Sequence, residues 1–334
     1  MKDESQLEHV FSKVADLMEE ENFEAAVTLL DEHLADFPNN PRLLYMKACF
    51  VSELGQTDLA IELYKKSAAN AGEMAVNPLF NLGNLYKDLD DFPNALETYS
   101  KVVELDPSVT DAWINMGFML DNHGEHERAL ECYDIAIQID DEDPMTWSNR
   151  GNTLRALNQH QEAEKSYRRA LELDIDDFAS QIGVAVCMTQ RGDHHGIQLL
   201  EKSLEESGHP IAAFELATAL ASLDRYSEAA EVFEQLAEAG MDEPAFWNNY
   251  AESLAKLSRT DEALEYFDRA IQGNPEFEAA YFGKARLLQT QNRFQEARPV
   301  IEKMLEVASE EFKAQPSVRA LVTLAVSGPD PSNN

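Results

Sequence analysis

The chain has 334 residues, of which 62 are acidic and 27 basic, and this gives a formal net charge of −35 at pH 7. Nucleic-acid binding needs a basic surface and anionic membranes repel an acidic one, so neither is an expected partner. The acidic surface either keeps the protein soluble, as in a salt-adapted organism, or steers a basic partner.

The cysteines and the N-terminal residues bear on the cellular compartment in which the protein is expected. Cys49, Cys132 and Cys187 lie in separate segments and form no close pair, so we expect buried thiols in a reducing environment. Residues 1–5 lack the basic and apolar regions of a signal peptide. No run of about 18 apolar residues predicts a membrane span. We therefore expect a cytoplasmic protein with no membrane insertion.

Small residues recur along the chain at an almost constant spacing. Eight alanines are separated by 34 or 35 residues, apart from one double interval of 66: Ala26, Ala60, Ala95, Ala129, Ala163, Ala229, Ala263 and Ala297. A second track lies 12 residues before each alanine: Val14, Ala48, Gly83, Gly117, Gly151, Ala217, Ala251 and Ala285. Helices approach closely only where side chains are small, so each repeat is predicted to be a helix–turn–helix hairpin.

Aromatic and turn residues follow the same period. Four residues after the alanines, one helical turn on, an aromatic track is expected to fill the space between neighbouring hairpins. Its members are Tyr64, Tyr99, Tyr133, Tyr167, Phe233 and Phe267. Turn residues fall between the two helices of a repeat, at Gly55, Asp90, Gly124 and Asn158. Prolines close repeats at Pro38, Pro107 and Pro275.

The full pattern is clearest in the repeats at 110–143 and 144–177. Trp113, Trp147 and Trp247 occupy one position in three repeats. The order Trp, Gly or Ala, Ala, aromatic, Pro at a period of 34 residues resembles the tetratricopeptide repeat, over about residues 7–311. The resemblance implies an all-α protein, a right-handed superhelical solenoid of about nine helix–turn–helix units.

The period also predicts the domain organisation. Residues 1–177 should form an N-terminal stack of five repeats, 178–209 a degenerate sixth repeat and 210–311 a C-terminal stack of three. The predicted repeat boundaries are 7–40, 41–75, 76–109, 110–143, 144–177, 178–209, 210–243, 244–277 and 278–311.

The sixth repeat departs from the pattern. Ile197 replaces the alanine, Leu204 replaces a small residue, and two residues are missing. Gly192, Gly196 and Gly208 are expected to loosen this hairpin, so we predict a kink or shift of the superhelix there.

Residues 312–334 follow the last repeat. The apolar segment 317–326 is predicted to be a capping helix, because the end of a solenoid exposes a hydrophobic face. The alternative is a dimerisation surface. Residues 327–334 are expected to be a disordered tail.

The resemblance implies that the first helix of each repeat lines a concave groove, through positions 2, 5, 6, 9, 12 and 13 of the repeat. Asparagines gather at three of these positions: Asn81, Asn115, Asn149 and Asn249 at position 6, Asn84 and Asn152 at position 9, and Asn248 at position 5. Amides match the donors and acceptors of a peptide backbone. This ladder resembles the peptide-binding superhelix of O-linked N-acetylglucosamine transferase. The alternative is that asparagine is a consensus residue that caps local turns.

Other predicted groove residues are apolar or charged. Phe80, Ile114 and Phe118 are large apolar side chains that could be binding hot spots or could pack locally. Arg155 is a basic groove residue in the fifth repeat. Together with the asparagines, these four residues form the predicted peptide-binding groove.

The groove lacks the cations of a carboxylate clamp. Asn84 and Asn115 match the asparagines of that clamp in chaperone-binding members of the family, but Phe80, Met145 and Asn149 stand where it has lysine, lysine and arginine. We therefore expect no binding of acidic chaperone tails.

The sequence predicts no catalytic, metal or cofactor site. It has no Gly-rich phosphate loop, zinc spacing or nucleophile elbow. His123 and His126 flank a turn without a third converging ligand. The predicted function is a non-catalytic adaptor for an extended peptide or partner protein, and the acidic charge favours a basic or amphipathic one. The alternatives are a scaffold that oligomerises through its ends, in which the C-terminal segment would join copies, and a regulatory subunit of an enzyme complex.

Overall fold

The computed structural model describes residues 7–327, apart from the side chains of residues 73 and 325–327. This part of the chain is helical and has no strand. The chain divides into two compact parts, which we call the N-terminal half, Met1–Asp177, and the C-terminal half, Phe178–Asn334. The predictions made for residues 1–6 and for the tail after residue 327 lie outside the described residues.

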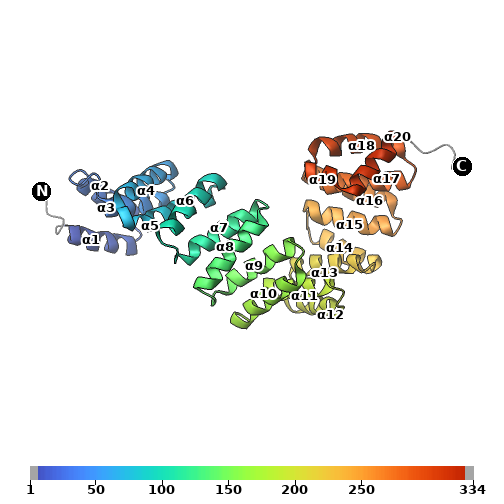
Figure 1. The fold of residues 1–334 in the computed structure, drawn as a ribbon, viewed down its shortest axis with the longest axis horizontal. Coiled ribbons are helices and arrows are strands. Elements are labelled where there is room, and N and C mark those ends of the chain that lie inside the picture. Colours follow the sequence, from blue (N-terminus) through green and yellow to red (C-terminus); the bar gives the residue numbers. More distant parts are fainter. Residues whose placement is uncertain (1–6, 328–334) are drawn as a thin grey trace. The chain divides into compact units, whose positions relative to one another are not determined.

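The N-terminal half contains five helical hairpins (Figure 1). Their helices are α1 (Leu7–Glu19), α2 (Phe23–Leu34), α3 (Pro41–Glu53), α4 (Thr57–Ala71), α5 (Val76–Asp88), α6 (Phe92–Leu105), α7 (Thr110–Asn122), α8 (His126–Ile139), α9 (Pro144–Ala156) and α10 (His160–Leu173). A 3-10 helix, η2 (Gly72–Ala75), connects α4 to α5. Each second helix packs on the first helix of the next hairpin.

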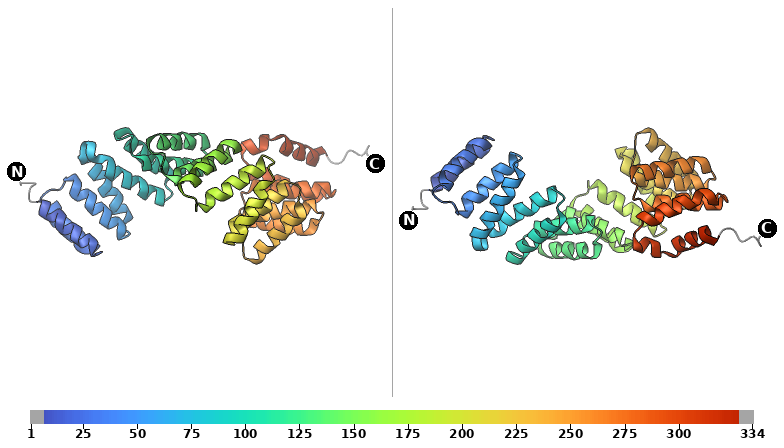
Figure 2. Two further views of the ribbon diagram at one scale, coloured as in Figure 1. Left: turned by 90° about the horizontal axis from the view of Figure 1, so that it is seen from below. Right: turned by 90° about the horizontal axis from the view of Figure 1, so that it is seen from above.

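The C-terminal half continues with four hairpins and two final helices. These are α11 (Phe178–Gln190), α12 (His195–Ser207), α13 (Pro210–Ser222), α14 (Tyr226–Glu238), α15 (Pro244–Lys256), α16 (Thr260–Gly273), α17 (Glu278–Thr290), α18 (Phe294–Val307), α19 (Glu310–Ala314) and α20 (Pro316–Ser327). Two further views show the same succession of paired helices within each half (Figure 2). The prediction of nine helical hairpins followed by a terminal helix is confirmed. No described helix is long and apolar enough to cross a membrane.

Local sequence explains where the helices begin. The side chain of Asn40 accepts a hydrogen bond from the Leu43 N–H at 3.1 Å and so caps α3. Asp143 caps α9 in the same way. Pro41 and Pro144 begin these two helices, where a missing N–H costs nothing.

Each hairpin turns at one residue with a positive φ, a conformation that costs little for glycine and more for other residues. These residues are Glu21, Gly55, Asp90, Gly124, Asn158, Gly192, Asp224, Ser258 and Asn292. The turn residues predicted in the second to fifth repeats are among them. The turn of the sixth hairpin, at Gly192, is therefore of the same kind as the others.

The small residues of the first helices face the aromatic residues of the second helices. A Cβ added at Gly83 would lie 2.7 Å from the Tyr99 ring, and one added at Gly151 would lie 2.6 Å from the Tyr167 ring. These rings are fully buried. The Tyr99 and Tyr167 rings pack against the first helix of their own hairpin. The Phe233 ring of the same track also packs on the next hairpin, with its centroid 5.8 Å from that of Phe246 and 5.6 Å from that of Tyr250. The aromatic track therefore fills space inside the hairpins, and at Phe233 also the predicted space between neighbouring hairpins.

The sixth hairpin is regular, contrary to the expected loosening. Its helices α11 and α12 each have 13 residues. Gly196 lies where α12 closely approaches α11, and a Cβ there would clash with the Ala185 carbonyl oxygen. Gly208 ends α12 in the left-handed conformation, with its N–H bonded to the Leu204 carbonyl. Gly196 therefore allows α11 and α12 to pack closely, and Gly208 ends α12.

Helix α20 covers the last hairpin. Its side chains Val318 and Leu321 are buried, and they pack in one cluster with Tyr281, Ile301 and Met304 of α17 and α18. The predicted capping helix is thus present.

Candidate functional site

The candidate site lies along the first helices of the N-terminal half, α3, α5, α7 and α9. On α5, the Asn81 amide nitrogen donates to the Tyr45 hydroxyl at 3.1 Å and lies 3.7 Å from the Cys49 sulfur. Asn81 and Asn84 line a cavity of about 360 Å³ between α3 and α5. Its other lining residues are Cys49, Ser52, Glu53, Tyr64, Leu85 and Asp88.

The next asparagines bond to one another. The Asn84 side-chain oxygen accepts from the Tyr99 hydroxyl at 2.6 Å and from the Asn115 amide at 3.1 Å. The Asn115 oxygen accepts from the Lys87 ammonium group at 3.4 Å. The bond between Asn84 on α5 and Asn115 on α7 therefore joins the third hairpin to the fourth.

The asparagines of the fifth hairpin, Asn149 and Asn152, form fewer side-chain hydrogen bonds with described residues than Asn84 and Asn115. The Asn152 side-chain oxygen accepts from the Tyr167 hydroxyl at 2.7 Å, but its amide nitrogen has no partner within residues 7–327. The Asn149 side chain forms no hydrogen bond with any described residue, although its backbone carbonyl accepts from Thr153. The amides of α9 are thus the ones that a peptide backbone could bind without displacing an internal bond.

The apolar residues of the predicted groove are not equally exposed. Phe80 and Ile114 are half-buried and pack against the core, and the Phe80 ring centroid lies 6.0 Å from that of Tyr99. Phe118 is 44% exposed, and Met145 at the start of α9 is 61% exposed. Arg155 is half-buried on α9.

The C-terminal half contains the last two predicted groove residues. On α15, the Asn248 amide donates to the Asn249 oxygen at 3.3 Å, and the Asn249 amide donates to the Thr218 hydroxyl at 3.4 Å. The Asn248 oxygen is buried and has no partner within the described residues. A separate cavity of about 260 Å³ lies between α15 and α17, and its lining includes Glu252, Lys256 and Arg286.

Burial raises the pKa of the phenols beside the asparagines. Burial, with a smaller contribution from Cys49, raises the pKa of Tyr45 to about 12. Burial also raises the pKa of Tyr99, and the negative charge of Asp88 adds to this shift. An ordinary phenol is already protonated near neutral pH, so the raised pKa keeps these hydroxyl groups protonated to higher pH, and that of Tyr99 donates to Asn84.

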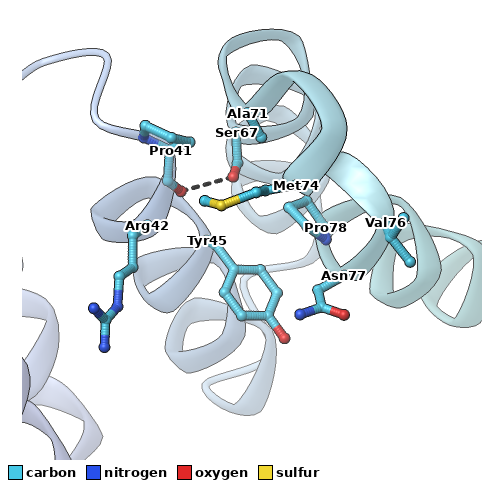
Figure 3. Close-up of a pocket in the computed structure, with 9 residues that line it drawn as sticks. All are labelled: Pro41, Arg42, Tyr45, Ser67, Ala71, Met74, Val76, Asn77 and Pro78. Atoms are coloured by element: carbon cyan, nitrogen blue, oxygen red, sulfur yellow. Dashed lines mark hydrogen bonds between the residues drawn. The ribbon is translucent and has the colours of Figure 1, made fainter. Parts of the chain in front are cut away.

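A second cavity beside α3 was not predicted. It has a volume of about 380 Å³ and lies where the start of α3 meets the end of α4, η2 and the start of α5 (Figure 3). Its lining residues are Pro41, Arg42, Tyr45, Ser67, Ala71, Met74, Val76, Asn77 and Pro78. The available signal was the interval of 35 residues between Ala60 and Ala95, because η2 lies inside it.

The described side chains hold no group of three or more His, Cys, Asp or Glu residues that could bind a metal ion. His126 bonds to Asp121 at 2.7 Å, and the His123 ring stacks on Phe92 with centroids 3.7 Å apart. These two histidines thus contact one carboxylate and one aromatic ring of the same half.

Comparison with solved structures shows the same fold. Yeast Tom70 superposes with a TM-score of 0.56 at 15% identity, covering 95% of this chain and 88% of that chain. The C-terminal part of a TPR repeat-containing protein from Cytophaga hutchinsonii gives a TM-score of 0.53 at 16% identity, covering 82% and 98%. At these identities the likeness concerns the fold alone. A search of curated proteins finds no match.

Family models match the sequence directly. Three models described as tetratricopeptide repeat match residues 76–109 and 144–177, residues 197–244 and 214–277, and residues 254–323. The matched segments span more than half of the chain, and the segments 76–109 and 144–177 each coincide with one helical hairpin. The chain belongs to the tetratricopeptide repeat family.

Proposed function

We propose that this protein is a non-catalytic adaptor that binds an extended peptide of a partner protein along the first helices of its N-terminal half. The observation that carries the proposal is the open hydrogen-bonding capacity on α9. The side chain of Asn149 and the amide nitrogen of Asn152 have no hydrogen-bond partner within the described residues, while the side chains of Asn84 and Asn115 are already bonded.

The surroundings of these amides favour a peptide as the ligand. Phe118 on α7 and Met145 on α9 expose much of their apolar side chains, and α7 packs beside α9. Exposed apolar groups beside amide donors and acceptors suit a chain that offers main-chain polar groups and side chains in alternation. The net charge of −35 favours a ligand with basic residues and accelerates its association at low salt.

The test is a selection of peptides that bind the full chain, followed by affinity measurements at low and high salt. The Asn149→Ala, Asn152→Ala double variant should bind a selected peptide about tenfold more weakly or worse, because two hydrogen bonds contribute roughly 1–3 kcal/mol. The control is Asn70→Ala on α4, where an exposed amide donates to the Lys66 carbonyl.

An unchanged affinity in the α9 double variant, with helicity retained, would rule out the proposed mode of binding. A peptide whose affinity does not fall with added salt would remove the electrostatic part of the proposal.

A further inference from the structure

The cavity of about 380 Å³ beside α3 is mainly apolar. Its floor and walls come from Pro41 and Tyr45 of α3, Ala71 of α4, Met74 of η2 and Pro78 of α5 (Figure 3). Its volume is within the range of about 300–1,000 Å³ that is usual for ligand pockets. Helix η2 replaces the connecting loop and contributes Met74, whose side chain is 71% exposed.

The polar groups at the rim of this cavity are mainly hydrogen-bond donors. Arg42 has only donors, and Asn77 presents an exposed amide. The Tyr45 hydroxyl already accepts from Asn81. The Ser67 hydroxyl is engaged, since it donates to the Pro41 carbonyl at 2.7 Å. A ligand should therefore combine an apolar group with oxygen acceptors.

The Arg42 guanidinium group is available to such a ligand. Its ion pair with Glu8 is 3.8 Å long, and the two side chains are 57% and 78% exposed. Ion pairs between groups this exposed contribute little stability, so a ligand oxygen can replace Glu8 at low cost. The guanidinium group also lies over the Phe11 ring, 3.7 Å from its centroid, and this contact holds it in place.

We propose that this cavity binds one aromatic side chain of the peptide partner, while Arg42 and Asn77 bind the carbonyl oxygens of the same peptide segment. An aromatic ring can pack against the rings of Tyr45, Pro41 and Pro78. The flexible thioether side chain of Met74 can adjust to the shape of that ring. Asn81 joins Tyr45 to the asparagine row, so the cavity adjoins the surface proposed above. The inference rests on the proposed function for its natural ligand, because it names one subsite of that surface.

The first experiment uses a small probe and does not require the natural partner. The full chain, labelled with 13C in its methionine methyl groups, is titrated with N-acetyl-tryptophan amide, and N-acetyl-alanine amide serves as the control ligand. Comparison with a Met74→Leu variant assigns the Met74 signal. The expected result is a saturable shift of the Met74 methyl signal with the tryptophan probe and none with the alanine probe.

A pair of variants tests whether the shift comes from the cavity. Ala71 lines the cavity, whereas Ala69 on the same helix is exposed and does not line it. Ala71→Trp fills the cavity and should weaken probe binding at least tenfold, and Ala69→Trp should leave it unchanged. Circular dichroism checks that both variants remain folded. If the Met74 signal does not move, or moves equally in both variants, the subsite does not exist.

A second experiment separates this inference from the proposed function. Peptides selected on the unmodified chain should share an aromatic residue, and the Ala71→Trp variant should bind them at least tenfold more weakly. If such peptides bind equally well to Ala71→Trp but lose affinity in the Asn149→Ala, Asn152→Ala variant, the subsite proposal fails and the adaptor function stands. If no peptide binds while the probe still shifts Met74, the adaptor function fails and the cavity remains a binding site for aromatic groups.

Discussion

The Tyr99 hydroxyl donates a hydrogen bond of 2.6 Å to the Asn84 side chain, which lies 15 residues earlier in the same hairpin. Tyr167 makes the same bond to Asn152 at 2.7 Å, and the Tyr64 hydroxyl lies 3.5 Å from the Cys49 sulfur at the equivalent position. The residue at position 9 of these repeats is therefore bound by the second helix of its own hairpin. Asn84 also accepts from Asn115 of the next hairpin, whereas Asn152 has no second bond among the described residues, and this difference leaves the Asn152 amide open to a ligand.

Asn84→Ala and Asn149→Ala should have different effects on stability. Asn84→Ala leaves the buried Tyr99 hydroxyl without its acceptor, and this should cost about 1–3 kcal/mol. Asn149→Ala breaks no internal bond and should change stability by about 0.5 kcal/mol at most. Urea denaturation followed by circular dichroism measures both. In a Tyr99→Phe background the cost of Asn84→Ala should shrink, and a cost that stays the same would show that this bond is not its source.

Gly117→Ala should destabilise the fourth hairpin. The added Cβ would lie 2.8 Å from the Tyr133 ring, which is buried and cannot move freely. Such overpacking costs about 1–3 kcal/mol, measurable as a lower urea midpoint. A Tyr133→Leu background removes the ring and serves as the control. If Gly117→Ala costs as much there, the close approach of glycine and ring does not explain the glycine.

Removal of α20 should uncover the apolar end of the C-terminal half. A chain that ends after residue 311 loses Val318 and Leu321, which cover Ile301 and Met304. The last hairpin should then unfold more easily and the truncated chain should associate, because exposed apolar surface drives association. Light scattering and thermal unfolding of the full and truncated chains measure both effects. The scaffold alternative expects the reverse, a full chain that assembles and a truncated chain that is monomeric.

Alkaline pH should weaken the fold. Burial raises the pKa of Tyr45 and of Tyr250 from an ordinary value near 10 to about 12. Between these values the unfolded chain releases phenolic protons that the folded chain retains, so stability is full below pH 10 and falls as the pH rises toward 12. Chemical denaturation at stepped pH measures this loss. Tyr45→Phe should reduce its slope, and an unchanged slope would exclude a contribution from Tyr45.

The repeat period made most of the fold predictable. Small residues, aromatics and turn residues recur at fixed offsets because the two helices of each hairpin pack through the same kind of contact. The contact of Gly83 with the Tyr99 ring is one example. In the sixth hairpin the role of Gly196 was not predictable, because a glycine that allows a close helix approach cannot be told in a sequence from one that loosens a hairpin.

The candidate site was predictable only in part. Asparagines at groove positions were visible in the sequence, but their hydrogen-bond partners were not. The partner of Asn84 is a tyrosine on the opposite helix, and that of Asn81 is a tyrosine in the preceding hairpin. The cavity at Met74 depends on the path of η2, which a single extra residue in the period does not specify.

The aromatic residue of the second helix is Phe in the seventh and eighth hairpins, and it has no hydroxyl to offer. There the position-9 side chains bond, among the described residues, only to the next hairpin, whereas Asn84 bonds both to Tyr99 of its own hairpin and to Asn115 of the next one. Thr218 accepts from Asn249, and Glu252 pairs with Arg286. A tyrosine on the second helix therefore adds a bond to the position-9 side chain from within its own hairpin. We expect Phe-to-Tyr exchanges at these buried positions to reorient the position-9 side chains, so that an array of such hairpins could change the surface it offers while the residues on that surface stay the same.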